Sequence, residues 1–194
     1  MLQTIRLKSR YLDQMTDEEF FDFCQQNHDL RIERAKNLDI IIMSPTGSLT
    51  GKYSGEVFRQ LANWNVISES GEVFDSSAGF TLPDQSVKSP DACWIAIDRW
   101  NALSPEDQAR FAPVCPDFVV EIKSPSGSVS ELKTKMNEWM ENGCRLAWLI
   151  DPLNETVTIY RENTNPVVQA GFGILVSGED ILPGFSLDLS RLRK

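Results

Sequence analysis

The sequence lacks most of the side chains on which common catalytic and metal sites depend. It contains a single histidine, His28, so a Ser-His-Asp or Cys-His catalytic group would rely entirely on that residue. Histidine-rich metal sites are excluded for the same reason. The four cysteines are widely spaced and form no Cys-x-x-Cys pair, which favours reduced thiols over a disulfide framework or a zinc site. Carboxylates and lysines are therefore the groups expected to carry any chemistry.

Long hydrophobic runs are also missing. The apolar runs, such as residues 40–43 and 146–150, have the length of a strand and are too short to cross a bilayer. The first residues, Met1 to Arg6, show neither the hydrophobic region nor the small-residue cleavage site of a signal peptide. We therefore expect a cytoplasmic protein that has no membrane partner.

Positive charge is scarce. The chain has 19 Lys and Arg residues against 28 Asp and Glu residues, which gives a formal charge of −9. This balance argues against a protein that coats nucleic acid without sequence preference, because such binding depends on neutralising phosphates. It does not exclude a nucleic-acid enzyme, whose metal-binding carboxylates are themselves negative. The length of 194 residues suits one domain, residues 1–194, better than two.

The hydrophobic patterns and capping signals predict an α/β fold. Helices are expected at residues 16–27, 48–67 and 129–142, with a short one starting at Ser104. Strands are expected at residues 30–35, 39–44, 72–75, 79–82, 91–97, 117–123, 145–150 and 156–161, and residues 83–89 read as a polar loop. The strand–helix–strand order near residues 117–150 predicts one right-handed crossover. The expected architecture is a central mixed β-sheet flanked by helices.

One predicted strand carries charged residues at its end. Glu121 and Lys123 follow an apolar run and are two residues apart, so they lie on the same face of the strand. Charged side chains are seldom buried without partners. A site for a divalent cation and a phosphodiester would explain them, whereas a simple ion pair between Glu121 and Lys123 is the alternative.

Two Pro-Asp pairs that directly precede an apolar strand compete as the source of a second carboxylate. Asp117 shares a face with Glu121, but four residues of strand separate the two by about 13 Å. One Mg²⁺ ion, with ligand distances of about 2.1 Å, cannot bind both Asp117 and Glu121. Asp91 opens a different predicted strand, and a neighbouring strand can bring it beside Glu121. We therefore choose Asp91 and interpret Asp117 as a strand-entry or turn residue.

Pro90-Asp91 followed by Glu121-x-Lys123 resembles the signature of the PD-(D/E)XK nuclease superfamily, and the surrounding sequence resembles its Uma-two family of restriction endonucleases. The segments that carry this resemblance are Arg31-Ile32-Glu33, residues 40–47, 71–74, 89–91, 116–121, 124–126, 148–152 and 182–185. The resemblance implies a restriction-endonuclease-like core with Asp91, Glu121 and Lys123 as catalytic residues. It also matches Glu33 to an upstream acidic position and Lys135 to a lysine on the helix after the core strand.

The sequence departs from many relatives at Lys123. The family often has a nonpolar residue there, which leaves the helix lysine to act, whereas this chain has both Lys123 and Lys135. Nothing in the motif is lost, and the pattern does not decide which lysine faces the substrate. A solvated helix face is the alternative for Lys135, which has glutamates at helical spacing. Glu33 lies between Arg31 and Arg34, so a local salt bridge is its alternative.

The function expected from these residues is Mg²⁺-dependent hydrolysis of DNA, with Mn²⁺ as a substitute metal. Asp91, Glu121, the carbonyl of Ile122 and Glu33 would bind the metal, since hard cations prefer oxygen ligands. Lys123 or Lys135 would orient water or stabilise the transition state. A homodimer is expected because cutting both strands of a duplex is easiest with two symmetric sites.

Two other functions fit the same residues. The first is a catalytically silent module that binds nucleic acid or protein on the nuclease scaffold, which the negative charge favours. The second is a metal-dependent hydrolase of a smaller phosphate ester. Trp139 and the other tryptophans in apolar segments are expected to pack in the core.

Overall fold

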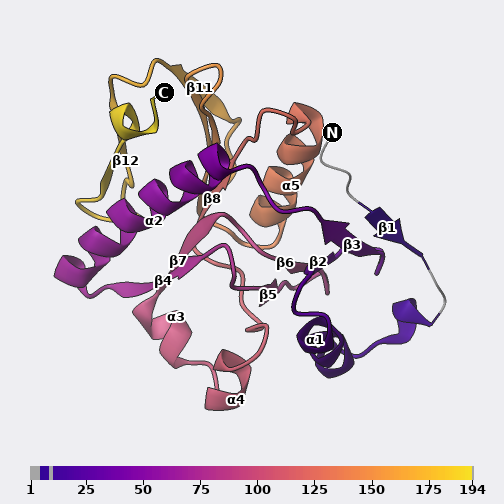
Figure 1. Ribbon diagram of the computed structural model, residues 1–194. Helices are drawn as coiled ribbons and strands as arrows, with labels where there is room; N and C mark the ends of the chain where they lie inside the picture. The colour runs from indigo at the N-terminus through magenta and orange to yellow at the C-terminus, as the bar shows by residue number, and fades with distance from the viewer. Residues whose placement is uncertain (1–4, 9–10, 194) are drawn as a thin grey trace.

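The computed structural model describes residues 5–8 and 11–193, so most of the stretch from Met1 to Arg6 that was considered for a signal peptide lies outside the described residues. The described part is a mixed α/β structure built on two main β-sheets. In Figure 1 the smaller sheet and helix α1 lie to the right of the larger sheet. None of the described helices combines the length and the apolar content needed to span a membrane.

The larger sheet has six strands. In spatial order they are β11 (Val167–Ala170), β10 (Thr156–Arg161), β9 (Leu146–Asp151), β8 (Phe118–Ile122), β7 (Ala92–Ala96) and β4 (Gly71–Asp75). The pair β8–β9 is parallel, and the other neighbouring pairs are antiparallel. Parallel neighbours need a crossover segment, which here contains helix α5. The predicted mixed sheet with its strand–helix–strand unit is thereby confirmed.

The smaller sheet has five strands, and two further strands form a separate pair. The five are β1 (Ile5–Leu7), β3 (Ile40–Met43), β2 (Arg31–Arg34), β6 (Val87–Lys88) and β5 (Phe80–Thr81), and the pair is β12 (Leu175–Ser177) with β13 (Ser186–Asp188). The strands expected at residues 30–35 and 39–44 are confirmed, and they pair as the antiparallel hairpin β2–β3. The prediction of a loop over residues 83–89 was wrong in part, because β6 lies there. A two-residue strand has no periodicity to detect, and β6 depends on its pairing with β2 and β5.

The helices follow their sequence signals. They are α1 (Asp17–Gln26), α2 (Ser48–Ser68), α3 (Ile97–Asn101), α4 (Pro105–Gln108) and α5 (Val129–Glu141), with short 3₁₀ helices at Leu12–Gln14 and Leu189–Leu192. Thr16 and Glu19 form the predicted capping box, in which each side chain accepts a hydrogen bond from the backbone N–H of the other residue. The strand predicted at residues 91–97 ends one residue early, because the chain turns into α3 at Ile97.

Alternation along β8 divides the core into two layers. Phe118, Val120 and Ile122 pack in the layer that contains the buried residues of α2. Val119 points the opposite way, into the layer that contains Met136 and Trp139 of α5. Glu121, two residues after Val119, therefore faces α5.

A third, smaller core lies between α1 and the five-stranded sheet and contains Phe20, Ile32, Ile40 and Val87. Side-chain contacts join this part of the chain to the larger sheet, among them the ion pair between Glu33 of β2 and Lys135 of α5. That residues 1–194 form one domain stays a prediction, which these contacts favour.

Candidate active site

Three carboxylates that are far apart in sequence lie together at the end of β8. Glu33 comes from β2, Glu121 from β8, and Asp91 from the residue before β7. Ala92 pairs with Val120 in the antiparallel register, so one further step places Asp91 opposite Glu121. Asp91 is held there because its Oδ2 accepts a hydrogen bond of 2.7 Å from the N–H of Ile122. We call Glu33, Asp91 and Glu121 the acidic cluster.

Lys135 of α5 lies within the acidic cluster. Its Nζ is 2.9 Å from Oε1 of Glu121 and 3.1 Å from Oε1 of Glu33. It also donates to the carbonyl oxygen of Ser89 at 3.0 Å. Lys135 therefore does not lie on a solvated helix face, and that alternative is wrong. Glu33 pairs with Lys135 and not with a neighbouring arginine, as its own alternative had it.

Further side chains support the cluster, and the sequence analysis missed them. Trp139 was expected only to pack in the core, but its Nε1–H also donates to Oε1 of Glu121 at 3.0 Å. Lys88 of β6 pairs with Glu138 of α5 at 2.6 Å. A sequence signal for Trp139 existed, because it follows Lys135 by four residues and so lies on the same side of the helix.

Burial shapes the ionisation of the cluster. Glu33 and Glu121 are each 4% exposed and Asp91 is 9% exposed. Burial raises the pKa of Asp91, although the Ile122 N–H and Lys135 oppose the shift. Burial likewise raises the pKa of Glu121, with Lys135 opposing it and the neighbouring Asp91 and Glu33 adding to it. Burial therefore disfavours the charged forms of Asp91 and Glu121, and a cation bound beside them would favour those forms.

The pKa values of Glu33 and of the neighbouring Lys135 are set by the opposite charges around each group. Burial alone would raise the pKa of Glu33, but Lys135, Lys88 and the Ser89 N–H outweigh it and lower that pKa. Burial would lower the pKa of Lys135, but Glu121 and Glu33 outweigh it and raise the pKa of the ammonium group. Lys135 therefore stays charged among the carboxylates.

Lys123, the other lysine of the predicted set, has a different partner. Its Nζ is 3.8 Å from Oδ2 of Asp151 and 3.4 Å from the carbonyl oxygen of Ser124. Asp151 ends β9, which runs parallel to β8 with Ile122 beside Ile150. A cross-strand neighbour lies about 4.8 Å away, closer than a residue two positions along the same strand. The alternative of an ion pair between Glu121 and Lys123 is not what the structure contains.

Asp117 lies at the opposite end of β8 from the acidic cluster. It is fully buried, and the N–H of Ala96 donates to its Oδ2 at 2.9 Å. Arg99 and Arg145 lie 2.9 Å and 3.6 Å from its Oδ1. The preference for Asp91 over Asp117 agrees with this arrangement, in which Asp117 fixes the entry to the strand.

The hydrogen bond from Trp139 to Glu121 predicts a loss of stability in Trp139→Phe. The ring still fills its fully buried position, but the carboxylate loses a buried donor. We expect the free energy of unfolding to fall by about 2 kcal/mol from the lost bond to a charged group, in addition to the effect of the smaller ring. Chemical denaturation measures the change.

Trp148→Phe is the matched control. Trp148 is also fully buried, but its Nε1 has no hydrogen-bond partner among the described residues. The same substitution there removes ring volume without removing a hydrogen bond. Equal losses in the two variants would show that the bond to Glu121 contributes nothing.

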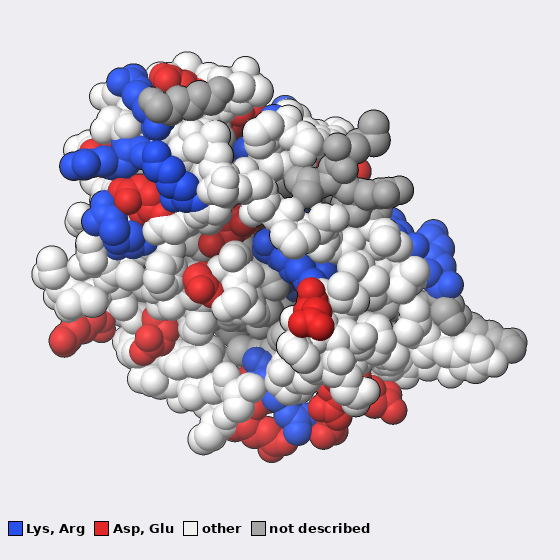
Figure 2. Space-filling model, viewed as in Figure 1, with Lys and Arg blue, Asp and Glu red and all other residues white. Residues whose placement is uncertain are grey.

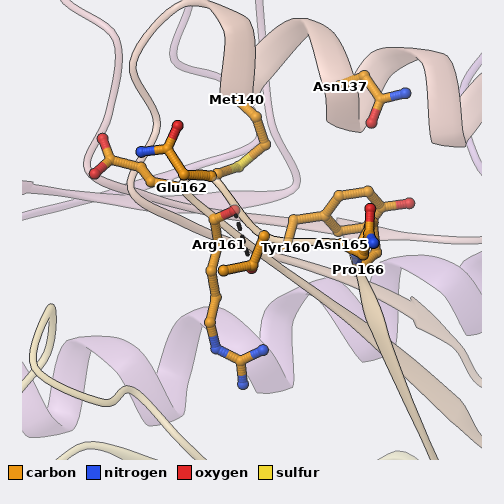
Figure 3. Close-up of a pocket in the computed structure, with 9 residues that line it drawn as sticks. Asn137, Met140, Tyr160, Arg161, Glu162, Asn165 and Pro166 are labelled. Carbon is orange, nitrogen blue, oxygen red and sulfur yellow. Dashed lines mark hydrogen bonds between the residues drawn. The ribbon is translucent and has the colours of Figure 1, made fainter.

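Surface charge is unevenly distributed (Figure 2), and one hollow lies away from the acidic cluster. Figure 2 shows acidic side chains along the lower edge, over α4 and α1, whereas Lys and Arg side chains gather near the C-terminal segment and at the centre of the view, close to β6 and the lower end of α5. A hollow of about 500 Å³ lies between α5 and the β10–β11 turn, with Met140 extending from the helix on one side and Tyr160 and Pro166 on the other (Figure 3). None of the acidic cluster lines that hollow.

The described residues contain no group of three Asp, Glu, His or Cys side chains arranged to hold a metal ion. The acidic cluster instead surrounds the ammonium group of Lys135. The predicted set of Asp91, Glu121, Ile122 and Glu33 is therefore together in space, but its three carboxylates do not form a ready-made metal cage.

Comparisons with known proteins bear on the whole chain. The model of the Uma2 (Uma-two) family, described as "Putative restriction endonuclease", matches residues 17–190. A crystal structure described as a "putative nuclease belonging to DUF820", from Anabaena variabilis, superposes with a TM-score of 0.72. It is 20% identical and the match covers 92% of this chain and 97% of that one, which shows a shared fold.

One curated protein matches only a short segment of this chain. A mouse protein, "NADH dehydrogenase [ubiquinone] 1 alpha subcomplex subunit 4-like 2", is 42% identical over 45 residues, or 22% of this chain. The match spans about half, 52%, of that curated relative. It covers too little of either chain to bear on the acidic cluster.

Proposed function

The chain belongs to the Uma2 family, whose description is "Putative restriction endonuclease", and from this premise we propose that it hydrolyses phosphodiester bonds in DNA with Mg²⁺ at the acidic cluster. Mn²⁺ is the substitute metal in this proposal. The observation that carries it is the meeting of Asp91 and Glu121, two buried carboxylates from adjacent strands, beside the ammonium group of Lys135.

The donor set fits Mg²⁺ chemically. Mg²⁺ prefers oxygen ligands and is commonly bound by one or two carboxylates, with waters and substrate phosphates completing the shell. Asp91 and Glu121 supply the two carboxylates, and the carbonyl of Ile122 follows Glu121 directly. Burial raises the pKa of both carboxyl groups, and a divalent cation bound between them would stabilise their charged forms. Such an ion would polarise the phosphate and activate water.

In this proposal the remaining side chains position the carboxylates and stabilise the charge of the substrate phosphate. Lys135 would donate a hydrogen bond to a phosphate oxygen or to the attacking water, because its Nζ already lies at the carboxylates. Glu33 would hold Lys135 in place through the 3.1 Å ion pair, in place of the direct metal contact expected from the sequence. Trp139 would fix the orientation of the Glu121 carboxylate. Burial of the cluster strengthens each of these interactions.

Lys123 has a smaller part in this proposal than in the sequence analysis. Its Nζ is directed to Asp151, whereas Lys135 contacts Glu121. We therefore assign the substrate-facing role to Lys135 and leave Lys123 to order the loop that follows β8. The expected homodimer stays part of the proposal for duplex substrates, and analytical ultracentrifugation measures it.

Metal-dependent cleavage tests the function directly. The purified protein is expected to cut plasmid and linear DNA in Mg²⁺ or Mn²⁺ and to leave both intact in excess chelator. Asp91→Asn is expected to abolish cutting while keeping the fold, since an amide oxygen can still accept the Ile122 N–H. Gel electrophoresis over time measures the loss.

The same assay separates the alternatives. DNA binding without cleavage under every metal condition would support the silent binding module and contradict the enzyme. Cleavage that persists in chelator, or that is unchanged in Asp91→Asn, would remove the assigned site. Hydrolysis of a small phosphate ester with no action on DNA would support the metal-dependent hydrolysis at this site but contradict DNA as the substrate.

A further inference from the structure

A groove of about 690 Å³ opens beside the acidic cluster. It is bordered by β2 and β3, by the end of α1, and by the turn at Ser76 and Ser77. Arg31 and Ser89 both line it. Its volume is within the range of sites that enclose a small organic molecule.

The groove and the acidic cluster share one wall. The carbonyl oxygen of Ser89 accepts hydrogen bonds from Lys135 at 3.0 Å and from Nη2 of Arg31 at 3.3 Å. The N–H of Ser89 donates to Oε1 of Glu33 at 3.1 Å. A molecule in the groove that contacts Arg31 therefore lies close to Lys135, because both side chains donate to the same carbonyl oxygen of Ser89.

The lining combines one cation with apolar surface. Arg31 lines the groove and brings the planar donors of a guanidinium group to it, of which Nη2 donates to Ser89 and the buried Nε has no hydrogen-bond partner among the described residues. Ile32, Ile42 and Phe111 provide the apolar part. Asp29 also lines the groove, but it is strongly exposed and pairs with His28 at 3.5 Å.

A groove with one arginine and an apolar wall suits the phosphate and the base of a single nucleotide. Arginine binds phosphate oxygens through its planar donors, and bases pack on apolar and aromatic side chains. A base within a duplex is stacked and paired, so it can enter such a groove only after it leaves the stack, and that requirement is least costly for a strand that is already single. The cluster itself is nearly inaccessible, with Glu33 and Glu121 only 4% exposed.

We propose that the groove takes an unpaired nucleotide next to the phosphate to be cut, so that the substrate is a single-stranded or locally unpaired segment of DNA. This inference rests on the proposed nuclease function and specifies its substrate. Arg31 holds a phosphate of the unpaired strand, and the apolar wall receives the base. A fully paired duplex binds only outside the groove.

Binding without cleavage tests the inference separately from the nuclease activity. In chelator, fluorescence anisotropy compares a labelled oligonucleotide with the same oligonucleotide annealed to its complement. The wild-type chain is expected to bind the single strand about tenfold more tightly, as one additional contact to a charged group allows. Arg31→Gln is expected to remove that preference and to leave the duplex affinity unchanged.

Two further variants control the test. Arg191→Gln removes one exposed positive charge in the C-terminal segment and is expected to keep the preference. Ser76→Trp places a bulky ring in the groove at a half-buried position outside the cluster, and is expected to remove the preference even if Arg31→Gln does not fold. Circular dichroism verifies that each variant is folded.

The outcomes separate the two proposals. Equal affinity for both forms, or a preference that survives in Arg31→Gln and Ser76→Trp, would overturn the groove assignment even if the enzyme cuts DNA. A preference for the single strand that both variants remove would support the groove even if no metal condition produces cleavage, in which case the nuclease proposal alone fails.

Discussion

Glu121→Gln is expected to lower the rate of Mg²⁺-dependent DNA cleavage by about 10³-fold, because a metal ligand contributes about 4 kcal/mol to stabilising the charge of the transition state. The amide keeps the shape of the side chain but gives up the negative charge opposite Asp91. Its oxygen can still accept the hydrogen bond from Trp139. Initial rates of cleavage under saturating Mg²⁺ measure the effect.

The fold is expected to tolerate this substitution. Burial raises the pKa of Glu121, so a neutral side chain suits its buried position, and Lys135 keeps its ion pair with Glu33 when Glu121 becomes an amide. Glu131→Gln is the matched control, since Glu131 lies exposed on α5 and is expected to keep full activity. A Glu121→Gln variant that is folded and as active as the wild type would refute the assigned metal site.

Lys135→Met is expected to lower the free energy of unfolding by about 3–5 kcal/mol in the absence of metal. The substitution keeps an unbranched side chain but removes the ammonium group that lies 2.9 Å from Glu121 and 3.1 Å from Glu33. Removing one partner of a buried ion pair leaves the other charge uncompensated, which accounts for this magnitude. Urea denaturation monitored by circular dichroism measures it.

Mg²⁺ is expected to stabilise Lys135→Met more than it stabilises the wild type, because the variant has lost its own cation from the cluster. Lys133→Met is the control, since Lys133 is exposed two residues earlier on the same helix and its change is expected to stay within about 0.5 kcal/mol. If Lys135→Met unfolds at the same urea concentration as the wild type, the ammonium group does not compensate the carboxylates.

The meeting of Asp91 and Glu121 could be predicted from the sequence. Four residues along one strand are too far apart for a shared ion, so the partner of Glu121 had to come from a neighbouring strand. The register between β7 and β8 provides this, and Asp91 is additionally held by the Ile122 N–H. The apolar residues of β8 alternate between the two core layers, as strand geometry requires.

The surroundings of the two lysines could not be predicted in the same way. The partner of Lys123 depends on the parallel pairing of β8 with β9, which places Asp151 closer than Glu121. The partners of Lys135 depend on how α5 packs against two different sheets, and a helical pattern records which side is apolar but not what that side contacts. The five-stranded sheet was predicted in part: strands were expected at β2, β3 and β5, whereas β6 has two residues and shows no periodicity.

Lys135 reaches across the boundary between the two sheets and pairs with Glu33, which precedes it by 102 residues. The cluster is thus a product of complete tertiary assembly, since neither sheet alone contains both partners. On the proposed activity, a chain emerging from the ribosome has no working site until its first strands have docked on a helix made much later.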